Sequence, residues 1–267
     1  MKHFALIGES LTHSFSPQIH KIIFEITGLD ADYKLYEIER ELLDTKFKKA
    51  MDIFYGFNVT IPYKNDALSL LDCIDNISQE IGAVNTVKMK DKVSTGYNTD
   101  YFGFGITLDK YRVSIKQKKA YVIGTGGASK AVYTYLKNNG IGEITFISRS
   151  EKSNWIKDCN IITYDKINDV KGDIIINCTP LGMGKNIEFT PVEKNIISKF
   201  AYAIDLIYNP KDTLFLKHAK ELGVTAINGL YMLVGQAVKS QEIWNDMEFE
   251  ENTIQEIYDK VYQIMYK

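Results

Sequence analysis

Residues 120–150 read AYVIGTGGASKAVYTYLKNNGIGEITFISRS. The apolar start of this stretch predicts a buried strand, and its glycines predict a tight turn into a helix. We expect that helix over about 128–138 and a second strand at 143–148, which together make a βαβ unit. Apolar runs at 173–178 and 201–206 continue the alternation of strands and helices. This half of the chain therefore predicts a doubly wound α/β fold, with a parallel sheet covered on both faces.

The turn that follows the first strand is rich in glycine. Glycines allow a tight bend and a close approach of the backbone to a pyrophosphate, and the N-terminus of the next helix favours its negative charge. Where such turns usually carry a third glycine, this chain has Ser129, which is small enough to pack near the strand. A strand–helix turn that binds nothing is the alternative. The candidate dinucleotide-binding residues are Gly124, Thr125, Gly126, Gly127 and Ala128.

The end of the second strand, Ser148-Arg149-Ser150, indicates which dinucleotide binds. NAD sites usually carry an acidic residue there for the ribose 2′-hydroxyl. Here an arginine stands between two hydroxyls, in a chain whose 32 basic residues include only three arginines. A guanidinium holds a phosphate through two parallel hydrogen bonds, which lysine cannot do, so NADP is preferred over NAD. Glu151 keeps an NAD ribose site open as an alternative, and a merely solvent-exposed arginine is another.

Composition bounds the class of protein. The 267 residues are 45% hydrophobic and 25% charged, which is ordinary for a globular chain and excludes a mainly disordered one. The net charge of −2 gives no basic excess, so we expect no nucleic-acid partner. No apolar run is long enough to span a membrane and no signal-peptide pattern is present, so we expect a cytoplasmic protein. The widely spaced Cys73, Cys159 and Cys178 predict reduced, mostly buried thiols, with no disulfide and no metal site.

The N-terminal part of the chain also follows an α/β pattern. Ser16 is a good N-cap and Pro17 fits the first position of a helix, which we expect to end at Gly28. Another helix is predicted after Pro62. Strands are predicted at 3–8, 33–38 and 54–61, with a hairpin around Lys90-Asp91 and an amphipathic helix over about 254–265.

Two hydroxyls flank Phe15 just before the first expected helix, on Ser14 and Ser16. Hydroxyls beside the N-terminus of a helix are suited to hold a carboxylate, because the helix dipole favours negative charge there. An N-cap role for Ser16 competes for the same hydroxyl. Both interpretations of Ser16 remain open at this point.

The motif NVTIPYK places further polar groups after a strand. Asn58 and Thr60 point to the same side of that strand because side chains alternate with a period of two. The proline breaks the strand, so the amine of Lys64 is able to turn back toward the same site. Asn85 and Asp100, in GAVNT and GYNTD, extend the polar group. A lysine with a carboxylate partner is a proton-transfer pair, although a lysine taken alone is most often a solvated surface group.

The motifs SFSP, NVTIPYK, GAVNT, GYNTD, GTGGAS, NCTPLGM, IDLIYNP and GLYMLVGQA occur in this order. Together they resemble the shikimate dehydrogenase family, over about residues 3–240. The resemblance implies an α/β substrate-binding domain with a mainly parallel sheet, formed by 1–101 and 238–267. It implies a Rossmann-like NADP-binding domain over 102–237, with the active site in the cleft between the two. The implied activity is the reversible NADPH-dependent reduction of 3-dehydroshikimate to shikimate, in chorismate and aromatic amino-acid biosynthesis.

The resemblance also implies roles for individual residues. Lys64 matches the catalytic lysine of the family and Asp100 its partner. Expected substrate contacts are Ser14, Ser16, Asn58, Thr60, Lys64, Asn85, Asp100, Tyr208 and Gln236. Expected cofactor contacts are Gly124, Thr125, Gly126, Gly127, Ala128, Ser148, Arg149, Ser150, Thr179, Leu206, Gly229 and Met232. The family's Asn-Arg-Thr motif is Ser148-Arg149-Ser150 here, which keeps the arginine but weakens the case for strict NADP selectivity.

Two alternatives accompany this interpretation. A quinate/shikimate dehydrogenase that uses NAD or NADP differs only in ring substituents, which the sequence does not distinguish. A non-catalytic ligand-sensing protein on the same fold is the more remote alternative, because the intact Lys64 and Asp100 argue against it. We expect a small-molecule substrate and a monomer or homodimer.

Overall fold

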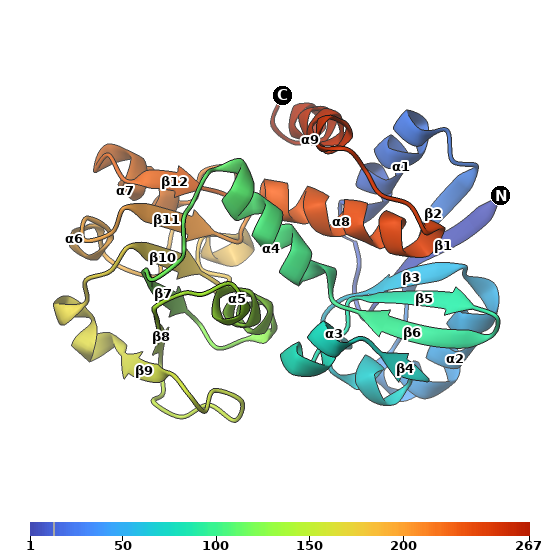
Figure 1. The fold of residues 1–267 in the computed structure, drawn as a ribbon, viewed down its shortest axis with the longest axis horizontal. Helices are drawn as coiled ribbons and strands as arrows, with labels where there is room; N and C mark the ends of the chain where they lie inside the picture. Colours follow the sequence, from blue (N-terminus) through green and yellow to red (C-terminus); the bar gives the residue numbers. More distant parts are fainter. Residues whose placement is uncertain (13) are drawn as a thin grey trace. The chain divides into compact units, whose positions relative to one another are not determined.

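The structure is a computed structural model, and it describes residues 1–12 and 14–267. The chain divides into two compact units (Figure 1). Unit 1 comprises Met1–Gly103 and Val234–Lys267, and unit 2 comprises Phe104–Leu233. The chain passes between units after residue 103 rather than 101, and after 233 rather than 237. This division places Gln236 in unit 1, with the other polar residues of the N-terminal part.

The sheet of unit 1 is mixed. Its strands are β1 (Lys2–Gly8), β2 (Ala31–Glu37), β3 (Gly56–Val59), β4 (Cys73–Ile74), β5 (Thr86–Lys90) and β6 (Val93–Tyr97), in the order β2-β1-β3-β5-β6-β4. β1 pairs in parallel with β2 and β3, and β4 pairs in parallel with β6. β5 is antiparallel to both of its neighbours, and β5–β6 is the predicted hairpin. As a result, the carboxyl ends of β1, β3 and β6 and the start of β5 lie at one edge of the sheet.

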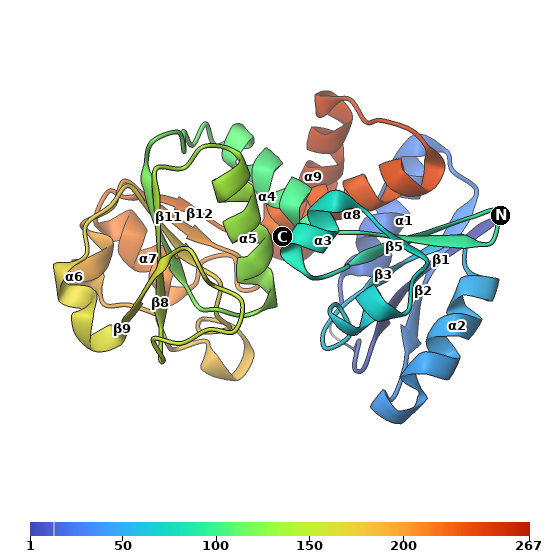
Figure 2. The ribbon, with the colours of Figure 1, turned by 60° about the horizontal axis from the view of Figure 1, so that its bottom comes forward.

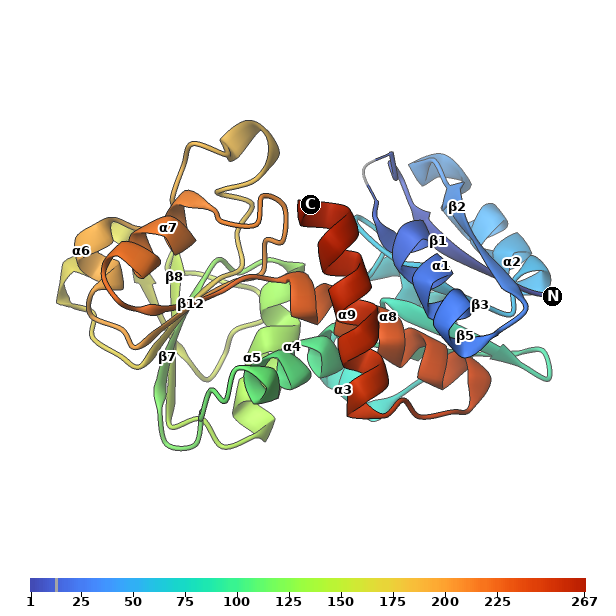
Figure 3. The ribbon, with the colours of Figure 1, turned by 90° about the horizontal axis from the view of Figure 1, so that it is seen from above.

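Helices cover both faces of this sheet. The helices of unit 1 are α1 (Ser16–Thr27), α2 (Leu43–Ile53), α3 (Asn76–Ile81) and α9 (Glu251–Tyr266), while α4 (Thr99–Lys110) and α8 (Leu230–Asn245) each run from one unit into the other. Phe47 of α2 packs in a cluster with Phe57 of β3. Phe4 of β1 packs in a second cluster with Phe24 of α1 and Trp244 of α8. Figure 3 shows α9 beside α1, with which it is in contact.

The sheet of unit 2 is parallel throughout. Its strands are β7 (Lys119–Ile123), β8 (Glu143–Ser148), β9 (Asn160–Thr163), β10 (Ile174–Asn177), β11 (Tyr202–Asp205) and β12 (Thr225–Ile227), in the order β12-β11-β10-β7-β8-β9. Figure 2 shows α5 (Gly127–Asn138) on one side of the sheet, with α6 (Lys194–Ile197) and α7 (Leu214–Glu221) on the other. Buried neighbours such as Val122 and Ile123 face opposite clusters, as a sheet covered on both faces requires.

Three sequence predictions are wrong. The segment after Pro62 is a turn followed by a short 3₁₀ helix, η2 (Asp66–Ser69), rather than an α-helix, because Tyr63 turns into the core. Ser16 is the first residue of α1 and does not cap it, since Phe15 occupies the cap position without a side-chain bond. The cysteines are free, but Cys73 is exposed and Cys159 and Cys178 are partly exposed rather than buried.

Candidate active site

Lys64 and Asp100 form an ion pair in unit 1. Nζ of Lys64 lies 2.6 Å from Oδ2 of Asp100, and their side chains are 26% and 16% exposed. Lys64 follows β3, and Asp100 lies in the first turn of α4, where the helix dipole favours a carboxylate. The Asp100 backbone N–H donates to Oδ1 of Asn98 at 3.2 Å. The pair thus combines a proton donor open to solvent with a carboxylate that orients it.

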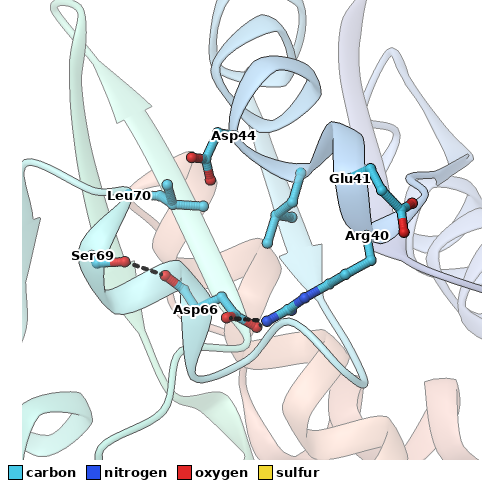
Figure 4. Close-up of a pocket in the computed structure, with 7 residues that line it drawn as sticks. Arg40, Glu41, Asp44, Asp66, Ser69 and Leu70 are labelled. Carbon is cyan, nitrogen blue, oxygen red and sulfur yellow. Dashed lines mark hydrogen bonds and ion pairs between the residues drawn. The ribbon is translucent and has the colours of Figure 1, made fainter.

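The segment that carries Lys64 is held on both sides. Before it, Tyr63 is fully buried and donates from its hydroxyl to the backbone oxygen of Ile38 at 2.6 Å. After it, Asp66 accepts two hydrogen bonds from the guanidinium of Arg40, at 2.6 and 2.9 Å (Figure 4). The backbone oxygen of Lys64 accepts from Val84 at 2.8 Å. Arg40, which no motif explained, therefore ties η1 (Arg40–Leu42) to η2.

A cavity of about 220 Å³ lies beside this fork. Figure 4 shows the residues that line it. The charged residues of its lining are three acidic ones, Glu41, Asp44 and Asp66, and Arg40, whose guanidinium is already bound to Asp66. Because the cation is satisfied inside the protein, the cavity offers no free positive group to an anionic substrate.

Ser14 and Ser16 lie together at the start of α1, both half-buried. The Ser14 hydroxyl donates to Oγ of Ser16 at 3.2 Å, and the Ser16 backbone N–H donates to Oγ of Ser14 at 3.2 Å. Because Ser16 does not cap the helix, the competing interpretation of its hydroxyl is removed. Two hydroxyls at the N-terminus of a twelve-residue helix are available for a carboxylate.

Asn58 is the centre of a buried polar network. Its Nδ2 donates toward the Asn85 backbone oxygen at 3.1 Å and toward the hydroxyls of Thr86 and Ser240, both at 2.9 Å. Its Oδ1 accepts from the Tyr33 hydroxyl at 2.8 Å. Asn58 is 5% exposed and both ends of its amide are occupied, so we assign it to positioning its neighbours rather than to direct substrate contact.

Among the described residues, only the oxygen end of the Asn85 side-chain amide has hydrogen-bond partners. Its Oδ1 accepts from the Thr99 backbone N–H at 2.7 Å and from the Thr86 hydroxyl at 3.0 Å. Within residues 1–12 and 14–267, its Nδ2 meets no acceptor. The two amide hydrogens of Asn85 are therefore available to a bound ligand. Thr99 precedes Asp100, so this contact also links Asn85 to the start of α4.

Gln236 joins the same network through the backbone. The Ser240 hydroxyl donates to the backbone oxygen of Gln236 at 2.9 Å and meets the Thr86 hydroxyl at 3.0 Å. Sequence reasoning missed Thr86, Ser240 and Tyr33. Only Thr86 had a local signal, because it follows Asn85 in the GAVNT motif. Thr60 is half-buried after β3, and its backbone N–H donates to Ile7 at 2.8 Å.

In unit 2, the glycine-rich turn connects β7 to α5. Gly126 occupies the N-cap position and Gly127 begins the helix. A Cβ added at either glycine would meet no atom within 4 Å, so the space beside the turn is open to a ligand. Gly124 has φ +95°, which disfavours any side chain, and an added Cβ would lie 2.9 Å from Cγ2 of Thr179. Ser129 is buried as predicted, and its hydroxyl donates to the Gly126 oxygen at 2.6 Å.

Arg149 follows β8 and is exposed. Its guanidinium has no acidic partner in the part of the chain that the structure describes. Glu151, the acidic residue that would serve an NAD ribose, instead accepts from Nζ of Lys166 at 2.5 Å. The cation at this strand end is thus free for an anion while the nearby carboxylate is occupied, which fits a 2′-phosphate better than a 2′-hydroxyl.

A buried carboxyl supports the neighbouring strand ends of unit 2. Asp205 accepts from the Thr213 hydroxyl at 2.7 Å and from Nδ2 of Asn177 at 3.0 Å. Oδ1 of Asn177 in turn accepts from the Thr179 hydroxyl at 2.7 Å. Burial raises the pKa of Asp205 to about 7, against the opposing effect of these hydrogen bonds. Asp205, which lies in the IDLIYNP motif but was not among the predicted site residues, therefore positions Thr179.

The remaining candidate residues of unit 2 also follow its strands. Leu206 and Tyr208 follow β11, and burial raises the pKa of the Tyr208 phenol. Gly229 comes just before α8, and a Cβ there would lie 2.0 Å from the backbone oxygen of Leu206. Only glycine permits this approach. Met232 is buried one turn further on.

Two features are absent from the described part of the chain. In residues 1–12 and 14–267, no three His, Cys, Asp or Glu side chains gather as metal ligands would. Over the same residues, no helix has the length and apolar character needed to cross a membrane.

Comparison with known proteins gives consistent matches. The family model of the shikimate dehydrogenase substrate binding domain matches residues 6–87. The chain is 45% identical over 263 residues to the shikimate dehydrogenase (NADP(+)) of Clostridium beijerinckii, covering 97% of each. A chorismate mutase/shikimate 5-dehydrogenase fusion protein from Clostridium acetobutylicum matches with TM-score 0.98 and 44% identity, covering 100% of this chain and 99% of that one. Shikimate 5-dehydrogenase from Thermus thermophilus, in complex with NADP(H) and shikimate, matches with TM-score 0.87 and 29% identity, covering 97% and 99%.

Proposed function

The chain belongs to the shikimate dehydrogenase family, and we propose that it catalyses the reversible NADPH-dependent reduction of 3-dehydroshikimate to shikimate. It is an NADP-dependent oxidoreductase that acts on a CH–OH group, in the biosynthesis of chorismate and aromatic amino acids. The observation that carries the proposal is the Lys64–Asp100 pair at 2.6 Å. A lysine held in this way is the proton donor and acceptor that a carbonyl/alcohol interconversion needs.

Unit 1 is the substrate-binding unit in this proposal. The match to a substrate binding domain over residues 6–87 lies entirely within it. Ser14 and Ser16 hold the substrate carboxylate through their hydroxyls. The free Nδ2 of Asn85, the hydroxyl of Thr60 and the amide of Gln236 bind the ring hydroxyls. Tyr208 is a further proposed substrate contact.

Unit 2 holds the cofactor. NADPH, when bound, supplies the hydride. The open space beside Gly126 and Gly127 fits a pyrophosphate at the N-terminus of α5, and the unpaired Arg149 fits the 2′-phosphate. Thr125 and Ala128 complete the pyrophosphate turn, and the hydroxyls of Ser148 and Ser150 flank the phosphate. Residues near the nicotinamide are Thr179, Leu206, Gly229 and Met232.

Residues of unit 1 carry out the proton transfer. During reduction, the Lys64 ammonium donates a proton to the oxygen on C3 of the substrate, and in the reverse direction the amine removes it. Asp100 orients the ammonium toward that oxygen through the hydrogen bond at 2.6 Å. Binding of the far carboxylate by the serines turns the C3 end of the ring toward Lys64, which places the reacting groups together.

Formation of NADPH from NADP and shikimate, followed by absorbance, tests this function directly. We expect kcat/KM to be highest for shikimate with NADP. The same assay with quinate and with NAD tests the alternative that the chain is a quinate/shikimate dehydrogenase. Comparable or higher values with quinate would assign the chain to the quinate/shikimate enzymes. A folded sample that forms no reduced cofactor with either acid would instead favour the ligand-sensing alternative.

The setting of the enzyme is also a proposal. We place it in the cytoplasm as a monomer or homodimer that acts on a small molecule without a nucleic-acid partner. The net charge of −2 and the three free cysteines support this setting. Light scattering of the purified protein determines the oligomeric state.

A further inference from the structure

We propose that Trp155 is a positioning residue that orients the backbone N–H of Gly126 for the pyrophosphate of the cofactor. The inference rests on the proposed function and adds to it a residue that lies outside every motif of the sequence. The observation that carries it is a hydrogen bond within unit 2. Nε1 of Trp155 donates to the backbone oxygen of Thr125, in the glycine-rich turn, at 3.0 Å. An indole N–H is only a donor, so the direction of this bond is fixed.

This bond determines which way the next N–H group points. The oxygen of Thr125 and the N–H of Gly126 belong to one trans peptide group, so they point in opposite directions. Because Trp155 holds the oxygen, the Gly126 N–H is directed away from the indole. That N–H has no hydrogen-bond partner in the part of the chain that the structure describes. A Cβ added at Gly126 would meet no atom within 4 Å, so a ligand has room to approach.

Ser129 provides a second anchor of the same kind. Its hydroxyl donates to the backbone oxygen of Gly126 at 2.6 Å. That oxygen shares a peptide group with the N–H of Gly127, which is therefore directed away from the hydroxyl. Gly127 is the first residue of α5, and the first N–H groups of a helix have no partner within the helix. Two side chains thus hold the carbonyl groups of the turn, and two neighbouring N–H groups are left for a phosphate.

Trp155 reaches the turn because the connection that carries it has no helix. β8 and β9 are parallel neighbours, and such strands are usually connected through an α-helix. Residues 149–159, all of which the structure describes, contain none (Figure 1). The ring of Trp155 instead packs edge-on against Phe146 of β8 and Tyr133 of α5, with centroids 5.5 and 5.7 Å away. The next residue, Ile156, is buried in the same cluster, so the ring is held beside the turn.

The same connection begins with Arg149, the proposed 2′-phosphate residue. A change at Trp155 is therefore able to act on the cofactor in two ways. It acts either through the N–H of Gly126, which NADP and NAD would both use, or through the path of the Arg149 segment, which only NADP would use. We assign the first role, because the hydrogen bond to Thr125 is direct, whereas no hydrogen bond joins the side chains of Trp155 and Arg149 in the described part of the chain.

Trp155→Phe tests this role, because it removes the indole N–H and keeps an aromatic ring against Phe146. We expect the Kd values for NADP and for NAD, measured by calorimetry, to rise by the same factor, about three- to tenfold. The Kd for 2′-AMP, which has the 2′-phosphate but no pyrophosphate, should be unchanged. Trp244→Phe is the matched control, since it removes an indole hydrogen bond of 2.8 Å, to the Val87 oxygen, in unit 1. It should leave all three constants unchanged.

The pattern across the three ligands decides the outcome. Weaker binding of NADP and 2′-AMP without weaker binding of NAD would overturn the inference, because Trp155 would then act through Arg149. Equal losses for all three ligands, or no loss for NADP and NAD, would overturn it as well. Trp155→Leu also lacks the donor, so it should give the expected pattern and decides the question if the phenylalanine variant does not fold. A wild-type protein that binds neither dinucleotide would instead refute the proposed function.

Discussion

Nζ of Lys64 and Oδ2 of Asp100 lie 2.6 Å apart although the two residues are 36 positions apart in the sequence. The turn after β3 presents the lysine, and the first turn of α4 presents the carboxylate. The buried Tyr63 and the Arg40–Asp66 fork hold the lysine segment from either side. The ammonium is therefore oriented before any substrate binds, which is how proximity contributes to catalysis.

Lys64→Ala should lower kcat by about 10²–10⁴-fold, because the substrate oxygen loses its proton donor. The KM for NADP should stay the same, since the lysine lies in the substrate-binding unit. Steady-state assays of NADPH formation measure both constants. Lys48→Ala is the control, because Lys48 is exposed on α2 and has no acidic partner among the described residues. A near-normal kcat in Lys64→Ala would remove the lysine from the mechanism.

Arg149→Ala should raise the KM for NADP by about 10- to 100-fold and leave the KM for NAD nearly unchanged. Only NADP has the 2′-phosphate that the guanidinium is proposed to bind. Arg149→Lys should recover part of the loss, because lysine keeps the charge without the paired hydrogen bonds. Glu151→Gln is the matched test of the NAD alternative, and we expect little effect from it. Equal losses for both cofactors in Arg149→Ala would contradict a 2′-phosphate role.

Two glycine substitutions should separate cofactor binding from stability. Gly126→Ala places a methyl group in open space, so the free energy of unfolding should change little while the KM for NADP rises. Gly229→Ala places its methyl group 2.0 Å from the Leu206 oxygen, so it should destabilise unit 2 by about 3 kcal/mol or more. Urea unfolding and NADP titration of both variants check the contrast. Equal stability of the two would mean that the chain relaxes at Gly229.

Asp205 should make the stability of unit 2 depend on pH. Its pKa is raised by burial from 3.8 to about 7, so the folded state keeps a proton that the unfolded chain releases. The resulting stabilisation is fully present below about pH 4 and is lost as the pH rises through about 7. Its size is on the order of 4 kcal/mol, from the change in pKa.

Asp205→Asn cannot titrate and keeps the shape of the side chain. The free energy of unfolding should therefore fall less between pH 4 and 7 in the variant than in the wild type. Urea unfolding followed by fluorescence of Trp155, which lies in unit 2, measures this difference. Parallel pH profiles would show that Asp205 titrates normally in the folded protein.

Much of the fold was predictable because its signals are local. The predicted strand at 143–148 coincides with β8, and the glycine-rich turn leads into α5 as expected. β4, β9 and β12 were missed, whereas β10 and β11, which are no longer than β9, were predicted because each lies in a longer apolar run of the sequence. The segment after Pro62 was mistaken for a helix because burial of Tyr63, a tertiary effect, decides its path.

The candidate site was predictable only in part. Lys64 and Asp100 stand in motifs with other polar residues, so the neighbouring sequence indicates that they belong to a site. Tyr33 and Ser240 have no such neighbours, and a tyrosine in a strand is ordinary. The contact between Asn58 and Ser240 joins residues 182 positions apart, and nothing in either local sequence reports it. Buried polar contacts of this kind, between residues far apart in the sequence, can be identified only from the folded structure.

The order of unit 1 and unit 2 along the chain has a consequence for synthesis. Phe4 stacks on Trp244 at 4.5 Å, so the core of unit 1 joins a residue that precedes unit 2 in the chain to a residue that follows it. Unit 2 is complete at residue 233, before Trp244 or α9 exists. Because chains grow from the N-terminus, we expect the inserted unit to fold first on the ribosome. Unit 1 is then the second unit to finish folding, although its first segment is made before unit 2. Until α8 and α9 are made, one face of the sheet of unit 1 stays uncovered.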